Sequence, residues 1–322
     1  MLRASLGRDD VEVVAINDLT DPEDLAYLLR YDSVHGRLPG LVEHTANALI
    51  INGREVSVTA TRDPGEIAWA ERGAHTVIES TGFFTAREKA ALHLKGGAKR
   101  VLISGPSKDA DGVFVPWVNT DGFNASQHQV VSMASCTTNC ISPICEILHR
   151  HFGIENLLLT TVHAYTSTQS IQDRPAKKKT RGRAAAVNIV PTSTGAAKAT
   201  ALVIPELAGR LDGMALRVPI PDGSVADMVF RLEKDTDVES IHKVLREEAA
   251  TRYEGVLAVS EDPLVSSDIV GDPHSSIVDA PSTMAMGPRT FKILSWYDNE
   301  IGYSTRLLDF ASFMEAQANG AG

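Results

Sequence analysis

Three cysteines lie within ten residues, at positions 136, 140 and 145. Cys136 stands in the polar run Ser135–Cys140, between an apolar strand predicted at 129–133 and a helix predicted at 141–151. A thiol at a helix N-terminus has a lowered pKa, because the helix dipole stabilises the thiolate. The run therefore predicts that Cys136 is a nucleophile, with hydroxyl neighbours that cap the helix or contact an anion.

Two other roles are possible for clustered cysteines. A Cys-x3-Cys pair is half of a metal site, but no second pair with suitable spacing follows. Burial as a small apolar side chain is usual for free cysteine, and it suits Cys140 and Cys145 better than Cys136. An odd number of clustered cysteines forms no disulfide framework and indicates a reducing, cytoplasmic location.

His163 ends an apolar strand predicted at 157–163 and begins a long polar loop, residues 164–188. A single histidine at a strand end is more often structural. Next to a thiol at a helix tip it becomes a candidate general base. Spacing along the chain does not bring the two side chains together, so both roles stay open.

Alternating strands and helices must position these residues. In the first part of the chain, strands are expected at 11–16, 76–79, 101–104, 113–118 and 129–133, helices at 22–31 and 86–94, and a hairpin at 47–58. This alternation predicts an α/β fold with a Rossmann-type, doubly wound dinucleotide-binding sheet. Beyond residue 140, strands at 157–163, 215–218 and 226–232 and a helix at 238–251 predict an α+β catalytic domain.

The expected domains are a cofactor domain at 1–135 and a catalytic domain at 136–302. A C-terminal helix at 303–322 is expected to pack back on the first domain.

Asp18 follows the strand predicted at 11–16, where an acidic residue of a dinucleotide fold binds the ribose hydroxyls. Capping of the next helix is the alternative. A Gly-x-Gly-x-x-Gly turn should lie roughly 20 residues earlier, and the chain has no room for it. We therefore expect the first strand and its turn to be missing, through a misplaced start or in a damaged, inactive copy. A chain of this length should then bind NAD poorly.

Composition excludes several classes of protein. The formal net charge is -10, which argues against a nucleic-acid partner, with the basic run 177–183 as a local exception. No apolar run reaches the length of a membrane span. Hydrophobic residues make up 43% of the chain, which is enough for sizeable cores.

Five motifs, in order along the chain, resemble those of the phosphorylating glyceraldehyde-3-phosphate dehydrogenase family. They are Ala134–Cys140, His163–Thr166, Pro191–Lys198, Leu216–Pro219 and Ser295–Glu300. The similarity extends from residue 11 to about residue 310 and covers nearly the whole chain.

The resemblance implies a reaction. Cys136 would attack the aldehyde of glyceraldehyde 3-phosphate, and His163 would accept the hydroxyl proton as hydride leaves for NAD. Hydride transfer would leave a thioester on Cys136. Inorganic phosphate would then attack this thioester and release 1,3-bisphosphoglycerate, a step of glycolysis and gluconeogenesis.

The resemblance also implies binding residues and a homotetramer. Thr166 and Arg217 would hold the substrate phosphate. The attacking phosphate would be held by Ser135, Thr137, Arg183, Thr194 and Gly195. The implied cofactor contacts are Asp18, Ser80, Thr81, Gly82, Ser104, Asn299 and Tyr303. No metal is implied.

Two departures from the family pattern bear on specificity and structure. Arg174, within Asp173-Arg174-Pro175, could accept the 2′-phosphate of NADP, but Asp18 would repel that phosphate, so NAD is expected. Pro116-Trp117 has no explanation from the sequence. Two alternative functions stay open: an erythrose-4-phosphate dehydrogenase that uses water in place of phosphate, and an inactive relative with a binding role.

Overall fold

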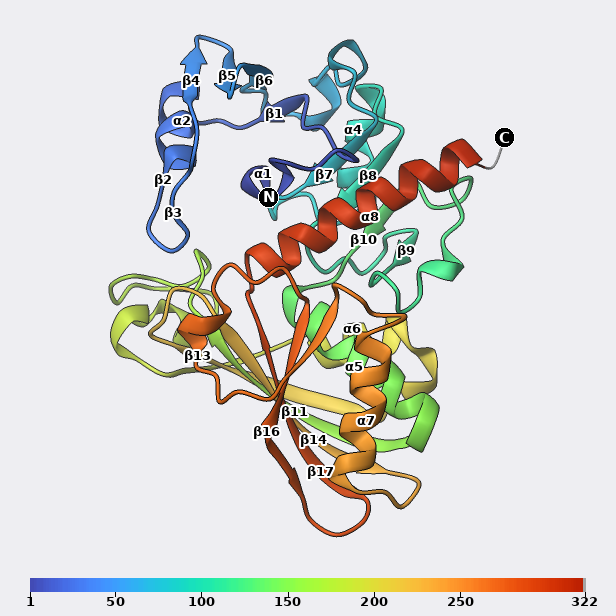
Figure 1. Ribbon diagram of the computed structural model, residues 1–322. Coiled ribbons are helices and arrows are strands. Elements are labelled where there is room, and N and C mark those ends of the chain that lie inside the picture. The colour runs from blue at the N-terminus through green and yellow to red at the C-terminus, as the bar shows by residue number, and fades with distance from the viewer. Residues whose placement is uncertain (321–322) are drawn as a thin grey trace. The chain divides into compact units, whose positions relative to one another are not determined.

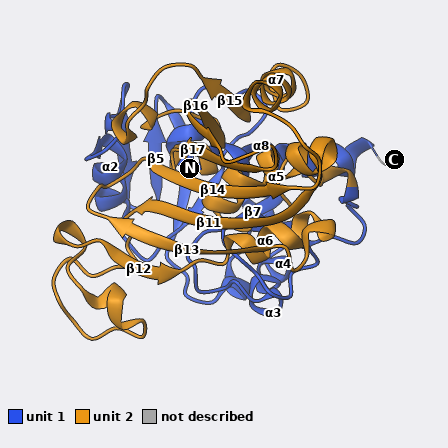
Figure 2. Ribbon diagram, turned by 90° about the horizontal axis from the view of Figure 1, so that it is seen from below, with its two compact units in different colours: residues 1–113, 122–133, 304–322 blue, residues 114–121, 134–303 orange. Residues whose placement is uncertain are grey.

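The computed structural model describes residues 1–320, so the last two residues of the helix expected at 303–322 lie outside the described residues. The chain forms two compact units, drawn in two colours in Figure 2. Unit 1 comprises Met1–Val113, Gly122–Met133 and Ser304–Gly322. Unit 2 comprises Phe114–Asp121 and Ala134–Tyr303.

Unit 1 contains two four-stranded sheets (Figure 1). In the first, the order is β4-β5-β6-β1, and β1 is parallel to β6 while the other pairs are antiparallel. In the second, the order is β7-β8-β10-β9 and every pair is parallel. The strands are β1 (Ala15–Asn17), β4 (Val42–Thr45), β5 (Ala48–Ile51), β6 (Arg54–Thr59), β7 (Thr76–Glu79), β8 (Arg100–Ile103), β9 (Gly112–Val113) and β10 (Val130–Ser132). The short strands β2 (Tyr31–Asp32) and β3 (Gly36–Arg37) pair with each other.

The helices of unit 1 cover these sheets with apolar side chains. Leu29 of α2 (Pro22–Arg30) belongs to one buried cluster with Leu49 and Val56 of the hairpin. Ala90 of α3 (Arg87–Ala90) joins Val101 of β8 in another. The remaining helices are α1 (Leu2–Ser5), α4 (Leu92–Lys95) and α8 (Ile301–Gly320), and α8 enters unit 1 at Ser304.

The hairpin predicted at 47–58 is confirmed. Asn52 and Gly53 connect β5 and β6 with φ of 52° and 82°. Two positive φ values define the type I′ turn that Asn-Gly favours between strands.

Two predicted strands are wrong in extent. The strand expected at 11–16 coincides with β1 only at residues 15 and 16, and the one expected at 113–118 coincides with β9 only at Val113. Val115 and Val118 are nevertheless buried, in a turn where Trp117 has φ 64° and its carbonyl accepts hydrogen bonds from Arg252. Buried apolar residues in a packed turn have the same sequence signature as a short strand.

Unit 2 is built on one seven-stranded mixed sheet, in the order β12-β13-β11-β14-β17-β16-β15. Its strands are β11 (Ile154–Ala164), β12 (Val190–Ser193), β13 (Leu211–Val218), β14 (Ser224–Leu232), β15 (Leu257–Ser260), β16 (Ser276–Ala285) and β17 (Thr290–Tyr297). The helices α5 (Cys136–Phe152), α6 (Ala196–Val203) and α7 (Val238–Ala249) pack against it. The α+β character predicted beyond residue 140 is confirmed.

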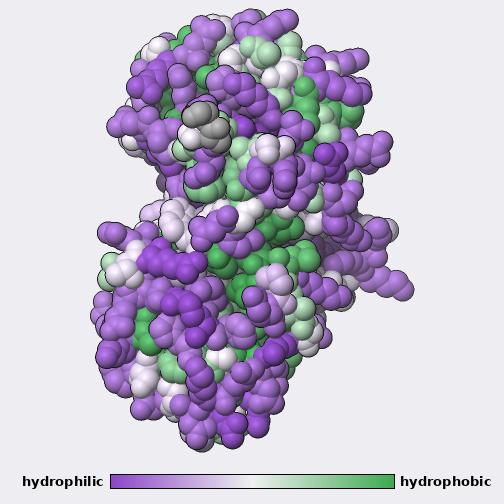
Figure 3. Space-filling model, turned by 90° about the vertical axis from the view of Figure 1, so that its right-hand side faces the viewer, coloured by the Kyte–Doolittle hydropathy of each residue, from purple (hydrophilic) through white to green (hydrophobic). Residues whose placement is uncertain are grey.

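Side chains of unit 2 alternate along the strands as a half-covered sheet requires. Leu157, Leu159 and Met228 are buried, whereas Leu158 is 62% and Val229 39% exposed. The view in Figure 3 shows a mostly hydrophilic surface with hydrophobic side chains in patches. No helix within residues 1–320 is long and apolar enough to cross a membrane.

Candidate active site

The first turn of α5 presents Cys136. Ala134 has φ 55°, an uncommon conformation for a residue with a Cβ, and Ser135 is the N-cap of the helix. The Ser135 hydroxyl accepts a hydrogen bond from the amide of Thr138 at 3.1 Å. The helix predicted at 141–151 therefore begins five residues earlier, because a serine cap starts it directly before the thiol.

His163 lies against this thiol. It occupies the penultimate position of β11, and its Nε2 is 3.4 Å from Cys136 Sγ. The Tyr297 ring packs edge-on against the imidazole at 5.9 Å, and its hydroxyl bonds to Thr137 and Thr161 at 2.8 Å each. The two candidates that the sequence left apart are thus brought into contact.

Tyr297 was missed as a site residue by sequence reasoning. It stands inside the motif Ser295–Glu300, and that position was the one available signal. Its hydroxyl joins the first turn of α5 to the end of β11, so it holds Cys136 and His163 at their mutual distance.

The prediction of a lowered thiol pKa at Cys136 is wrong. Burial raises the pKa of this thiol, although the positive charge of Arg217 and the amide of Thr137 act in the opposite direction. The helix terminus is only one of several contributions, and dehydration of a thiolate costs more here. Cys136 still keeps some exposed surface, whereas Cys140 and Cys145 have none.

His163 is held neutral. Burial, followed by the charge of Arg217, lowers the pKa of His163 to about 3. Arg217 Nη1 is 2.9 Å from His163 Nδ1 and donates to the Ala164 carbonyl at 2.7 Å. His163 Nδ1 also lies 2.7 Å from the Ala164 carbonyl oxygen, so each tautomer has a partner at Nδ1. In the tautomer in which Nδ1 accepts from Arg217, Nε2 carries the hydrogen toward Cys136 Sγ.

The anion-binding candidates in unit 2 have varied surroundings. The Thr166 hydroxyl bonds to Thr168, and the Thr194 hydroxyl accepts from the amide of Ala196. Gly195 is the N-cap of α6. Arg183 is 61% exposed and forms an ion pair with Asp173 at 3.0 Å.

Arg181 is a second residue that sequence reasoning missed. Its guanidinium donates to Thr192 at 3.1 Å and to Thr168 at 3.3 Å. Its charge acts on both His163 and Arg217, so it lies close to the reactive pair. Within residues 1–320 it forms no ion pair with a carboxylate. The signal available in the sequence was the basic run 177–183 itself.

Cofactor candidates occur in both units. In unit 1, a cavity of about 970 Å³ is lined by Asp18, Ser80 and Thr81. The Asp18 carboxylate accepts only from the amide of Thr20 in the described residues, so it is free to bind hydroxyls. Gly82 has φ 75° and the amide of Ser104 bonds to the Glu79 carbonyl.

In unit 2, Asn299 accepts a hydrogen bond from the hydroxyl of Ser224, and the Tyr303 hydroxyl donates to the carbonyl of Ala134 at 3.3 Å. Tyr303 is therefore tied to the residue two positions before Cys136. The residues in unit 1 fit the adenosine half of a dinucleotide. Asn299 and Tyr303 lie in the same unit as Cys136.

A dinucleotide-type sheet and a unit with a cysteine–histidine pair define an NAD-dependent oxidoreductase. Residues 1–87 match the NAD binding domain of glyceraldehyde 3-phosphate dehydrogenase, and residues 135–299 match its C-terminal domain. The chain belongs to the glyceraldehyde-3-phosphate dehydrogenase family.

Individual relatives are similar along almost their whole length. The chain is 52% identical to the glyceraldehyde-3-phosphate dehydrogenase of Geobacillus stearothermophilus over 317 residues, which cover 98% of this chain and 95% of that protein. It is 50% identical to that of Priestia megaterium over 317 residues, with the same coverage. It is 50% identical to glyceraldehyde-3-phosphate dehydrogenase 1 of Schizosaccharomyces pombe over 321 residues, with 99% and 95% covered.

Proposed function

We propose that this chain oxidises glyceraldehyde 3-phosphate to 1,3-bisphosphoglycerate with inorganic phosphate, through a covalent intermediate on Cys136. The observation that carries the proposal is the 3.4 Å contact between Cys136 Sγ and His163 Nε2 at the tip of α5. NAD, when bound, supplies the hydride acceptor.

Cys136 and His163 divide the chemistry between them. Cys136 Sγ attacks the aldehyde carbon to form a thiohemiacetal, and His163 accepts the proton of its hydroxyl as the hydride departs. A thioester remains, and phosphate attack releases the acyl phosphate. The low pKa of His163 keeps its imidazole unprotonated before each turnover.

Arg217 couples substrate binding to the tautomer of His163. While Arg217 donates to Nδ1, the hydrogen on Nε2 prevents His163 from acting as a base. Turning of the guanidinium toward a substrate phosphate frees Nδ1 to donate to the Ala164 carbonyl, which lies 2.7 Å away. Nε2 then becomes an acceptor beside Cys136.

Two phosphate subsites follow from the arginines. Arg217, with Thr166, is assigned to the substrate phosphate. Arg181, near Thr192 and Thr168, is the stronger candidate for the attacking phosphate than Arg183, whose exposed guanidinium is already paired with Asp173. Ser135, Thr137, Thr194 and Gly195 remain candidates for the same anion.

Steady-state kinetics with three alanine variants tests the subsites. One charge-assisted contact contributes about 1.5–3 kcal/mol, so Arg181→Ala should raise the Michaelis constant for inorganic phosphate about 10- to 150-fold. Arg217→Ala should mainly raise that for the sugar phosphate. Arg183→Ala is the matched control, and an effect on phosphate from Arg183 alone would return that role to it.

An assay with and without phosphate separates the alternative functions. Product formation from glyceraldehyde 3-phosphate should require inorganic phosphate. Phosphate-independent oxidation of erythrose 4-phosphate would favour the sister activity. No turnover of either aldehyde, with NAD bound, would favour a binding role.

The chain is proposed to form a homotetramer in the cytoplasm, with unit 1 as cofactor domain and unit 2 as catalytic domain. The face of the unit 2 sheet that bears Leu158, Met214 and Val229 is open: their side chains are 62%, 42% and 39% exposed. Leu158 pairs directly with Val229, so both point to the same face. Such a patch is typical of a subunit interface.

Sedimentation tests the assembly. The unaltered chain should sediment as a tetramer, and Leu158→Asp with Val229→Asp should shift it to smaller species. Asp212→Ala, on the same face but polar, is the control. A monomer at micromolar concentration before any substitution would contradict this assignment.

A further inference from the structure

One buried hydroxyl in unit 2 connects the end of β11 to Asn299. Ser224 is the first residue of β14, and its side chain is fully buried. Its Oγ accepts a hydrogen bond from the amide of Ala164 at 3.1 Å. Ala164 directly follows His163, and its carbonyl oxygen lies 2.7 Å from His163 Nδ1. Ser224 therefore contacts the peptide segment that orients the histidine.

The proton of the Ser224 hydroxyl points to Asn299. Ser224 Oγ lies 2.5 Å from Asn299 Oδ1, and a serine hydroxyl has a single proton to donate. This distance is within the range of O–H···O hydrogen bonds and below the range of N–H···O hydrogen bonds. The amide oxygen of Asn299 therefore faces Ser224, and the amide nitrogen Nδ2 faces the other way.

The amide nitrogen of Asn299 is available to a ligand. Asn299 is half-buried, and within residues 1–320 its Nδ2 forms no hydrogen bond and is not enclosed. A freely turning asparagine amide offers a ligand either a donor or an acceptor. An amide whose oxygen is held by Ser224 offers only its two N–H donors.

We infer that Ser224 is a positioning residue that holds the Asn299 amide in one orientation, so that the site selects a nicotinamide-type ring by a carbonyl oxygen on that ring. The inference rests on the proposed function, in which NAD is the hydride acceptor and Asn299 contacts its carboxamide. A carboxamide has both an oxygen acceptor and an N–H donor, and a freely turning asparagine would bind either one. Ser224 restricts the contact to the carboxamide oxygen.

Titration with NAD and two analogues tests the orientation of Asn299. An acetyl group in place of the carboxamide keeps the oxygen and removes the N–H donor, whereas an amino group keeps a donor and removes the oxygen. One hydrogen bond contributes about threefold to tenfold in affinity. In the unaltered protein, the acetyl analogue should bind within about threefold of NAD, and the amino analogue should bind about tenfold more weakly. Calorimetry up to millimolar ligand measures the three dissociation constants without turnover.

Ser224→Ala should change the affinities of the two analogues in opposite directions. The Asn299 oxygen is then free to turn toward the ligand, so the acetyl analogue should lose about threefold or more in affinity while the amino analogue gains. NAD should change less than either analogue. Ser224→Thr keeps the hydroxyl and should keep the order of the unaltered protein. Ser276→Ala is the matched control, because Ser276 is also fully buried but its hydroxyl bonds to Ser295 at 2.8 Å.

The signs of these changes separate a positioning role from a merely structural one. General loosening of the site by Ser224→Ala would weaken all three ligands alike, and that result would overturn the inference. An amino analogue that binds the unaltered protein as well as the acetyl analogue does, or no binding of NAD at millimolar concentration, would overturn it too. The expected order of affinities in a protein that oxidises no aldehyde would support the inference and count against the proposed reaction alone.

Discussion

Three cysteines on one helix have three different chemical environments. Cys136 is in the first turn, beside His163 and within the field of Arg217. Cys140 is fully buried, its Sγ lies 3.5 Å from the Ser295 hydroxyl, and burial raises its thiol pKa to about 12. Burial raises the pKa of Cys145 even further. Position along the helix therefore decides that Cys136 keeps exposed surface while the other two thiols are buried.

Alkylation by iodoacetamide should select Cys136 in the native protein. Cys140 and Cys145 can react only after local unfolding exposes their thiols. Local unfolding that costs about 4 kcal/mol slows labelling about a thousandfold. Because burial raises the pKa of Cys136, its labelling rate should increase with pH above 7. Mass spectrometry of each cysteine measures the rates.

Variants sharpen this test. Cys136→Ser should abolish dehydrogenase activity and leave the fold intact. Arg217→Leu should slow labelling of Cys136, because the positive charge lowers its pKa; Arg231→Leu, an exposed partner of Glu155, is the control. Similar labelling of all three native cysteines would refute the assignment of the nucleophile.

At the scale of elements, a buried polar network joins α4 to the end of β7 in unit 1. The Trp69 indole donates to His93 Nδ1 at 3.0 Å, so His93 Nε2 carries the hydrogen toward Glu79 at 3.0 Å. Burial alone would raise the pKa of Glu79, but the hydrogen bonds from His93 and Thr81 lower it. The network orients the turn that begins at Ser80.

Replacement of His93 should destabilise unit 1. His93→Ala leaves the Trp69 donor and the Glu79 carboxylate without this partner, at a cost of about 1–3 kcal/mol for each group. His93→Gln keeps a donor and an acceptor and should lose much less. Urea unfolding followed by tryptophan fluorescence measures the difference, and equal losses for both variants would show that only packing matters there.

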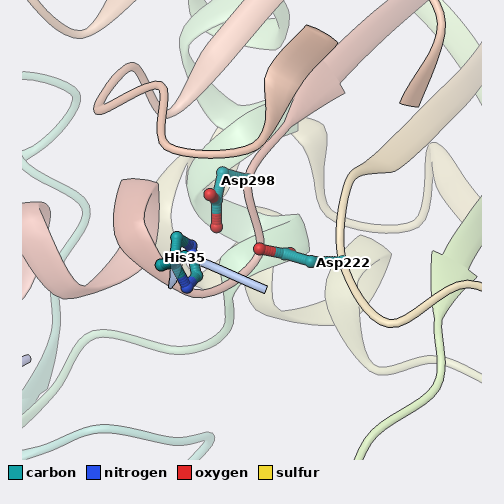
Figure 4. A group of neighbouring side chains, drawn as sticks. All are labelled: His35, Asp222 and Asp298. Atoms are coloured by element: carbon teal, nitrogen blue, oxygen red, sulfur yellow. The ribbon is translucent and has the colours of Figure 1, made fainter. Parts of the chain in front are cut away.

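For the chain as a whole, stability should depend on one pair of carboxylates in unit 2. Asp298 accepts from the amides of Gly271, Glu300 and Ile301 at 2.7–2.8 Å. The carboxylates of Asp222 and Asp298 lie close together (Figure 4). Burial, followed by the charge of Asp298, raises the pKa of Asp222 to about 7. The folded protein therefore holds a proton at Asp222 that the unfolded chain has already released.

The free energy of unfolding should fall as pH rises from about 4 to about 7, because the folded state binds more protons in that window. Asp222→Asn keeps a donor next to Asp298 and should flatten this dependence. Denaturant unfolding at pH 5 and pH 8 measures it, with Asp235→Asn as an exposed control. An unchanged slope in the Asp222 variant would rule out this residue as the cause.

Local sequence determined much of this protein. The capping serine, the Asn-Gly turn and the five motifs depend on residues close together in the chain, and they led to the family and to the proposal that Cys136 is the nucleophile. Apolar runs also predicted β7, β8 and β11 closely, since short buried strands differ from loops mainly in their side chains.

Tertiary structure decided what depends on distant residues. The contact between Cys136 and His163 spans 27 positions, and Tyr297 reaches Thr137 across 160. The raised pKa of Cys136 and the choice between Arg181 and Arg183 depend on burial and on charges brought together by folding. Solvation and electrostatic energies follow distance in space, whereas a sequence records only distance along the chain.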